Sequence, residues 1–234
     1  MDGCSAAGRA AGRGRAVIEE LLPDGVAAVE AFGDPPEAVL LPEEEEHVAR
    51  AVDKRRREFT TGRHCARGAL AKLGFPPVPL LPGPKREPGW PEGVVGSITH
   101  CTGYRAAVAA RADAVWTVGI DAEPNQPTPE GVLAAVALPR EQDMVALLGA
   151  RDPSVHWDRL LFSAKESVYK SWFPLTRRWL GFEDAELVLG RDGTFTARVL
   201  VEHPVVDGRA VSGFTGRWLA REGFVVTAIA VPAR

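Results

Sequence analysis

Two carboxylates, Asp121 and Glu123, stand two residues apart after the apolar stretch 115–120. In a β-strand, residues i and i+2 point to the same side, so the pattern predicts both carboxylates on one face. Carboxylates held close together repel each other unless one takes up a proton or a cation lies between them. Mg²⁺ prefers such oxygen ligands, together with substrate phosphates. By spacing alone, a solvated strand end with arginine partners is an equally good interpretation.

A third carboxylate, Glu166, lies on a predicted helix and is followed one turn later by Lys170. The apolar residues of this helix form a stripe, and Glu166 lies on the opposite side. A glutamate and a lysine at this spacing are common on solvated helix faces, where the pair contributes only a few tenths of a kcal/mol. Taken alone, the helix therefore favours an ordinary surface pair.

Residues suited to phosphate binding occur in two other segments. His100 follows Ser97 and Thr99 at the end of a predicted strand, and imidazole and hydroxyl groups can donate hydrogen bonds to phosphate. Arginine adds bidentate contacts. A lone histidine is more often structural, and a basic run is more often a solvated helix face, so neither signal decides by itself. The basic candidates are Arg55, Arg63, Lys85 and Arg86.

The apolar periodicities predict an α+β protein. Each half places helices before antiparallel strands, which predicts two similar lobes with a ligand site at the seam near residues 116–123. Segment 76–93, rich in Pro and Gly, is predicted to be a long ordered loop. We expect a flexible tail at 1–15, an N-terminal lobe at 16–117 and a C-terminal lobe at 118–234. The predicted helices cover about 42–52, 60–73, 139–148 and 155–172, and the predicted strands cover 26–32, 94–100, 104–110, 115–121, 185–189, 194–199, 210–218 and 224–231.

The composition is that of an ordinary soluble protein, with 45% hydrophobic and 25% charged residues. The net charge of −3 argues against a general nucleic-acid binder, and no apolar run reaches transmembrane length. The three cysteines are widely scattered, which favours a reduced, cytoplasmic chain over a disulfide framework. Phosphate-binding Gly-rich loops and the serine-hydrolase motif do not occur in the sequence.

The order of the signals resembles a known family. The sequence from 43 to 231 is similar to group II of the 4′-phosphopantetheinyl transferase superfamily, the surfactin-synthetase-activating and enterobactin type, and resembles its actinobacterial members most. The pair Gly-x-Asp-x-Glu and, later, Lys-Glu-x-x-x-Lys carries the resemblance. One departure is Phe162, where many relatives have Trp. The matching segments are Arg63–Arg67, Gly96–His100, Gly119–Glu123 and Phe162–Lys170.

The resemblance implies two pseudo-symmetric α+β lobes and transfer of the phosphopantetheine arm of coenzyme A to a serine of an apo carrier protein, with release of adenosine 3′,5′-bisphosphate. It implies that Asp121, Glu123 and Glu166 bind Mg²⁺. Glu166 would also act as base toward the serine, and Lys170 and His100 would hold diphosphate oxygens. The implied catalytic residues are Asp121, Glu166, Lys170 and His100, and the implied coenzyme A-binding residues are Arg55, Arg63, Lys85, Arg86, Thr99, His100, Asp121, Glu166 and Lys170.

The implied partners are acyl carrier proteins and the carrier domains of polyketide and nonribosomal-peptide synthetases, which are small, acidic and helical. Leu175–Leu180, with Arg177 and Arg178, is one candidate docking surface. Nucleic acid and membranes are not expected as partners, and a monomer is expected. Two other classes stay open: a metal-dependent phosphohydrolase that uses the same carboxylates, and a non-catalytic coenzyme A-binding module.

Overall fold

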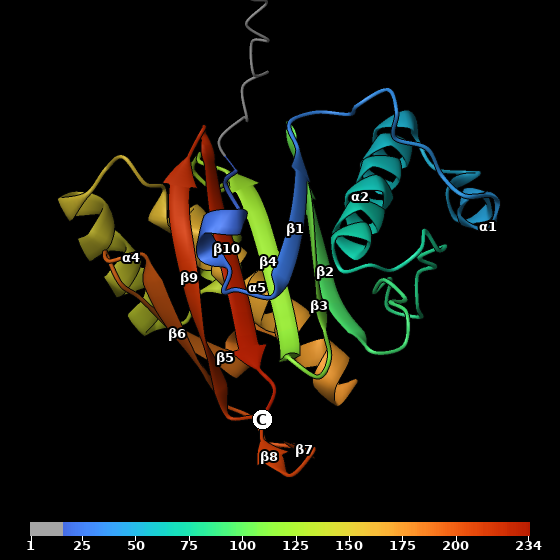
Figure 1. The fold of residues 1–234 in the computed structure, drawn as a ribbon. Coiled ribbons are helices and arrows are strands. Elements are labelled where there is room, and N and C mark those ends of the chain that lie inside the picture. Colours follow the sequence, from blue (N-terminus) through green and yellow to red (C-terminus); the bar gives the residue numbers. More distant parts are fainter. Residues whose placement is uncertain (1–15) are drawn as a thin grey trace, which may run out of the picture.

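The computed structural model describes residues 16–234 (Figure 1). The tail predicted at 1–15 lies outside the described residues. Within them, the N-terminal half forms a three-stranded antiparallel sheet in the order β1-β3-β2. The β2–β3 register pairs His100 with Arg105, so the predicted anion-binding residues lie next to the hairpin turn. The strands are β1 (Val26–Ala31), β2 (Val94–Cys101) and β3 (Tyr104–Arg111).

The C-terminal half of the described chain forms a five-stranded antiparallel sheet in the order β4-β10-β9-β6-β5. β4 (Val115–Pro124) carries Asp121 and Glu123, and it lies at one edge of this sheet, paired with β10. The boundary proposed between residues 117 and 118 falls inside β4. The other strands are β5 (Ala185–Leu189), β6 (Thr194–Val199), β9 (Gly213–Arg221) and β10 (Phe224–Pro232), and a small hairpin consists of β7 (Val205–Val206) and β8 (Arg209–Ala210).

Side-chain hydroxyls of β2 join it to the outer edge of β4. The backbone amides of Ile120 and Ala122 donate to Ser97 Oγ and Thr99 Oγ1, both at 3.1 Å. Ser97 and Thr99 are both buried. Buried amides at a strand edge are costly when they are left unpaired. The two hydroxyls therefore connect the sheets in place of backbone pairing.

Two long helices cover the sheets (Figure 1). α2 (Asp53–Lys72) packs on β1 and β3, and α5 (Trp157–Thr176) packs on β4 and β10. α4 (Pro139–Arg151) lies against α5 and β5. Each half thus has a long helix on an antiparallel sheet, and the α+β prediction is confirmed. The short helices are α1 (Pro42–Glu45), α3 (Val132–Val136) and the 3-10 turns Glu19–Leu21, Glu46–Val48 and Phe182–Asp184.

α5 approaches β4 most closely at Gly119. A Cβ atom at this position would lie 2.4 Å from both the Ser167 carbonyl oxygen and Ser171 Oγ, so only glycine fits. Thr117, on the same face of β4, donates from Oγ1 to the Ser171 carbonyl oxygen at 2.9 Å. The absence of a side chain at Gly119 brings α5 against the face that carries the carboxylates.

Several predicted boundaries are wrong. The helix predicted to begin at residue 60 begins at Asp53, because the basic run at 54–57 finds acidic partners: Arg56 pairs with Glu45, and Arg57 pairs with Asp34. The helix predicted at about 42–52 is shorter: α1 and the 3-10 turn after it end at Val48. Val52, which was expected on its apolar face, is 74% exposed. The strand predicted at 210–218 runs from Gly213 to Arg221, because 209–210 pairs with 205–206. Helix 155–172 begins at Trp157 and continues to Thr176, and α3 was not predicted.

No helix among residues 16–234 is both long and apolar enough to cross a membrane. Cys65 and Cys101 are buried free thiols, and burial raises the pKa of each to about 12. Neither is a thiolate nucleophile near neutral pH. Cys65 and Cys101 form no disulfide, as their scattered positions predict, whereas Cys4 lies outside the described residues.

Candidate active site

Asp121 lies at the centre of a polar cluster between β2, β4 and α5. Its Oδ1 accepts hydrogen bonds from Lys170 Nζ at 2.7 Å and from Thr99 Oγ1 at 3.2 Å. Lys170 Nζ also donates to the Ile120 carbonyl oxygen at 3.1 Å. The other carboxylate oxygen, Oδ2, is buried without a hydrogen-bond partner. Such an unsatisfied buried oxygen is unusual in a native protein and marks a candidate ligand position.

Glu123 lies two residues farther along β4 and contacts α5 through Arg159. Arg159 Nη1 lies 3.2 Å from Glu123 Oε2. Burial raises the pKa of Glu123 to about 7, repulsion from Asp121 adds to the shift, and Arg159 and Lys170 oppose it. Burial, with added repulsion from Asp121, therefore lets Glu123 hold a proton near neutral pH.

Glu166 faces the same region from α5. Burial raises its pKa; the Lys170 ammonium lowers it, and the Asp121 charge raises it. The set of carboxylates fits Mg²⁺, because the donors are oxygens, one of them lacks a partner, and a divalent cation would neutralise their repulsion. Among residues 16–234, however, no three His, Cys, Asp or Glu side chains converge on one point. Lys170 forms an ion pair with Asp121, and Arg159 forms one with Glu123.

Arg55 and His100 form a second polar group beside this cluster. Arg55 Nη1 lies 3.0 Å from His100 Nε2, which joins the N-terminal turn of α2 to the end of β2. His100 follows Thr99 directly on β2, so the two side chains point to opposite faces of the strand, Thr99 toward Asp121 and His100 toward α2. The Lys170 charge, which lowers the pKa of His100, links this group to the Asp121 cluster. Arg55, Thr99 and His100 are all predicted to bind coenzyme A. In the structure they lie near the junction of α2, β2 and β4.

Arg63 is placed differently from the other basic candidates. Its side chain is buried, Nε donates to the Leu80 carbonyl oxygen at 2.7 Å, and its guanidinium lies 4.1 Å above the centre of the Phe59 ring. Burial lowers the pKa of Arg63 to about 10. Its contacts tie α2 to the start of the long loop, and it does not line the main cavity.

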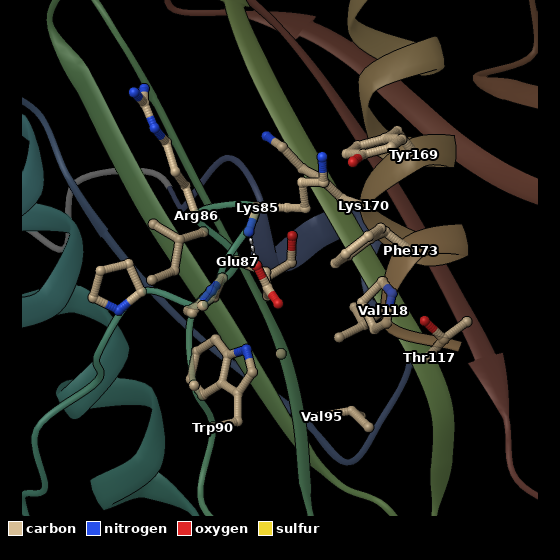
Figure 2. Close-up of a pocket in the computed structure, with 18 of the residues that line it drawn as sticks. Lys85, Arg86, Glu87, Trp90, Val95, Thr117, Val118, Tyr169, Lys170 and Phe173 are labelled. Atoms are coloured by element: carbon tan, nitrogen blue, oxygen red, sulfur yellow. Dashed lines mark hydrogen bonds between the residues drawn. The ribbon is translucent and has the colours of Figure 1, made fainter. Parts of the chain in front are cut away.

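The main cavity, of about 550 Å³, lies between this loop, β2, β4 and α5 (Figure 2). Lys85 and Arg86 border it from the loop, and Tyr169, Lys170 and Phe173 border it from α5. Glu166 also lines it, whereas Asp121, Glu123, Thr99, His100 and Arg55 lie outside its wall. Lys170 therefore connects the cavity with the carboxylate cluster.

The loop is fixed at both ends of this cavity. Buried Glu44 accepts the Leu80 amide at 2.9 Å and pairs with Arg67. At the other side, Glu87 lies 3.3 Å from Arg177 beyond the end of α5, and it also accepts the Lys85 amide at 2.9 Å. The prediction of a long ordered loop is confirmed.

Three residues near the site were not predicted: Tyr169, Phe173 and Arg159. Tyr169 and Phe173 follow Glu166 by three and seven residues, a spacing that places all three on one helix face. This periodicity was available in the sequence, but it resembles that of any half-buried helix. Arg159 carried no local signal, because its contact with Glu123 depends on how α5 lies on β4.

Comparison with known proteins identifies the family. The model of the 4′-phosphopantetheinyl transferase N-terminal domain matches residues 43–110, and the model of the 4′-phosphopantetheinyl transferase superfamily matches residues 117–227. The 4′-phosphopantetheinyl transferase Svp of Streptomyces mobaraensis is 59% identical over 221 residues, which cover 93% of this chain and 90% of Svp. The chain belongs to the 4′-phosphopantetheinyl transferase superfamily.

Other relatives agree with this assignment. The 4′-phosphopantetheinyl transferase PptT of Mycobacterium tuberculosis is 50% identical over 223 residues, which cover 91% of this chain and 97% of PptT. Enterobactin synthase component D of Escherichia coli is 30% identical over 176 residues, which cover 74% of this chain and 76% of that protein. The resemblance seen in the motifs is confirmed. As a 4′-phosphopantetheinyl transferase, the chain is an enzyme.

Proposed function

We propose that this enzyme transfers the 4′-phosphopantetheine arm of coenzyme A to a serine of apo carrier proteins, depends on Mg²⁺ and releases adenosine 3′,5′-bisphosphate. The observation that carries this proposal is that Lys170 both lines the 550 Å³ cavity and pairs with Asp121 at 2.7 Å. A ligand in the cavity would thus meet the carboxylate cluster at one basic side chain. Family membership supports the transfer and its use of coenzyme A.

Asp121, Glu123 and Glu166 are the residues that would hold the metal. The unpartnered Asp121 Oδ2 and the raised pKa values of Glu123 and Glu166 support this assignment. When bound, Mg²⁺ would neutralise charge on the diphosphate and orient it. Its presence would favour the ionised forms of Glu123 and Glu166, against the effect of burial.

In the proposed reaction, the serine hydroxyl oxygen bonds to the phosphorus that carries the pantetheine arm, and the bond from this phosphorus to the leaving phosphate breaks. Glu166 takes the serine proton, directly or through water. Lys170 and His100 hold diphosphate oxygens. Arg55, Lys85 and Arg86 surround the phosphates of the nucleotide, and Thr99 orients Asp121 through the bond between Thr99 Oγ1 and Asp121 Oδ1. Arg63 remains a proposed nucleotide-binding residue.

The proposed partners are carrier proteins of fatty-acid, polyketide or nonribosomal-peptide synthesis, met by a monomeric enzyme in the cytoplasm. Exposed Trp179 and the basic residues Arg177 and Arg178 follow α5, beside the cavity. An apolar and basic surface of this kind suits a small acidic partner. Both lobes of one chain contribute to the site, which supports a monomer.

The decisive test offers the enzyme, coenzyme A and Mg²⁺ to several apo carriers: an acyl carrier protein, a polyketide synthase carrier domain and a peptidyl carrier domain. Intact-mass spectrometry should show the gain of one phosphopantetheine arm on at least one carrier. Carriers whose acceptor serine is replaced by alanine should stay unmodified. Absence of modification on every carrier would contradict the proposal, and cleavage of coenzyme A without a carrier would favour the phosphohydrolase instead.

Mg²⁺ should stabilise the protein more at about pH 8 than at about pH 6, because metal and proton compete for the carboxylates. The folded-state pKa of Glu123 is raised from 4.5 to about 7, so the folded protein binds the proton more tightly than the unfolded chain does. Without metal, stability from this group is therefore lost as the pH rises from about 4.5 through about 7.

Thermal unfolding with and without Mg²⁺ measures the difference. Equal shifts of the melting temperature at both pH values would contradict a metal site that includes Glu123, and the Glu123→Gln variant should show a smaller pH dependence, with the remainder due to Glu166.

A further inference from the structure

The contact between Arg55 and His100 determines where the imidazole carries its proton. A guanidinium only donates hydrogen bonds, so His100 Nε2, 3.0 Å from Arg55 Nη1, must accept. The proton of the neutral ring then lies on Nδ1. This nitrogen points back toward α2, where Glu58 Oε2 lies 3.6 Å away. Arg55 and Glu58, three residues apart on one helix, thus contact opposite sides of the same ring.

Glu58 differs from Asp53, the other acidic residue of α2, because its side chain is only 10% exposed whereas Asp53 is exposed. Its other charged neighbour is Lys54, whose ammonium lies 3.9 Å away and is 70% exposed. A largely buried carboxylate with one distant, solvated ion pair gains little stability from that pair. The position of Glu58 is therefore better explained by its contact with His100.

The charged groups that act on His100 come from three elements. Arg55 and Glu58 belong to α2, Lys170 to α5 and Arg105 to β3. Burial lowers the pKa of His100 most; Glu58 raises it, and the three cations lower it further. The ring is therefore neutral near pH 7 in the structure, and Glu58 is the neighbour whose charge favours protonation.

We propose that Glu58 is a positioning residue that couples phosphate binding at Arg55 to protonation of His100. This inference rests on the proposed function, in which His100 and Arg55 hold phosphates of coenzyme A. When a phosphate oxygen draws the Arg55 guanidinium away from Nε2, this nitrogen takes up one proton from solvent and donates it in a hydrogen bond to the phosphate. The imidazolium keeps its Nδ1 proton directed to Glu58, whose carboxylate compensates the new positive charge.

Proton uptake on ligand binding tests the proposal directly. Calorimetric titration of the full-length enzyme with coenzyme A, and separately with adenosine 3′,5′-bisphosphate, is repeated at pH 7.5 in buffers of different ionisation enthalpy. The dependence of the heat on the buffer gives the number of protons taken up. We expect uptake by the wild-type enzyme and a decrease of at least about threefold in Glu58→Gln, which keeps a polar side chain of the same size beside Nδ1 but carries no charge. His100→Asn should also lose the uptake.

The matched control is Glu45→Gln, which makes the same chemical change in an exposed glutamate that pairs with Arg56 of α2. It should keep the wild-type uptake. A ¹⁵N spectrum of the His100 ring in Glu58→Gln should still show the proton on Nδ1 without ligand, which separates loss of charge from loss of folding. Unchanged proton uptake in Glu58→Gln, or none in the wild-type enzyme, would overturn the inference. Failure of the proposed function would instead appear as unmodified carriers in the mass assay.

Discussion

Replacing Asp121 by asparagine should reduce the rate of carrier modification by about three orders of magnitude while the fold is preserved. In the proposed site this carboxylate binds the metal, and metal-assisted charge stabilisation supplies several kcal/mol in a transition state. A loss of about 4 kcal/mol corresponds to about a thousandfold in rate. Initial rates with a saturating carrier and excess Mg²⁺ give the measurement.

The fold should tolerate this change because the Asp121 charge, although it pairs with Lys170, repels the carboxylates of Glu123 and Glu166. After burial, repulsion from Asp121 is the largest cause that raises the pKa of Glu123 to about 7, and the Asp121 charge also raises the pKa of Glu166. Asparagine can keep an oxygen toward Thr99 and Lys170 and removes the repulsion. We therefore expect an unchanged or higher melting temperature, and a lower pKa for Glu123 than in the wild-type protein.

The matched control is Asp113→Asn. The Asp113 side chain is 75% exposed, and its ion-pair partner is Arg111, which is not part of the Asp121 cluster. The variant should therefore keep full activity. A metal titration separates binding from chemistry, because Asp121→Asn should need much more Mg²⁺ for any remaining rate. If the variant retained more than about a tenth of the wild-type rate, Asp121 could not be a metal ligand in the reaction.

The strand and helix that carry the carboxylates and Lys170 were predictable because their signals are local. The apolar run before Asp121 identified β4, and apolar residues that recur every three to four positions identified α5. Glycine at position 119 is compatible with a close approach of another backbone or a ligand to this strand. The structure adds that this approach occurs at Ser167 and Ser171, where a Cβ atom on residue 119 would collide with α5.

The hydrogen bonds between the β2 hydroxyl groups and the backbone of β4 could not be predicted in the same way. The sequence marks Ser97 and Thr99 as possible phosphate donors. In the structure their hydroxyl oxygens also accept the amides of Ile120 and Ala122, and Thr99 Oγ1 donates to Asp121. This contact depends on two strands of different sheets lying edge to edge, which no local pattern records. The same limit applies to Arg63, whose motif suggests a ligand-facing side chain, although its Nε is bound to the Leu80 carbonyl oxygen.

Lys165 is the clearest case of a motif residue whose environment only the structure reveals. It is next to Glu166 in the sequence, yet it does not line the main cavity, and its ammonium lies 2.8 Å from Glu141 of α4. The two side chains are 2% and 1% exposed. Lys165 Nζ also donates to the carbonyl oxygens of Phe182 and Ala185, at 2.6 and 2.9 Å.

Glu141 is equally well satisfied. Its carboxylate accepts the amides of Leu138 and Leu187, both at 2.7 Å. Burial lowers the pKa of Lys165, and the contact with Glu141 opposes this shift. The pair thus joins α5, α4 and β5 inside the C-terminal half, and removal of one partner leaves the other charge buried.

Lys165→Met should therefore lower the free energy of unfolding by about 3–5 kcal/mol near pH 8. The loss should shrink near pH 5.5, because the buried Glu141 carboxylate, left without its cation, can take up a proton as the pH falls. Urea unfolding at the two pH values measures both quantities. Lys72→Met, which removes an ammonium bound to the Ala28 carbonyl oxygen, is the matched control and should cost no more than about 1.5 kcal/mol at either pH. An equal loss at both pH values would mean that lost packing, and not the unpaired carboxylate, causes the destabilisation.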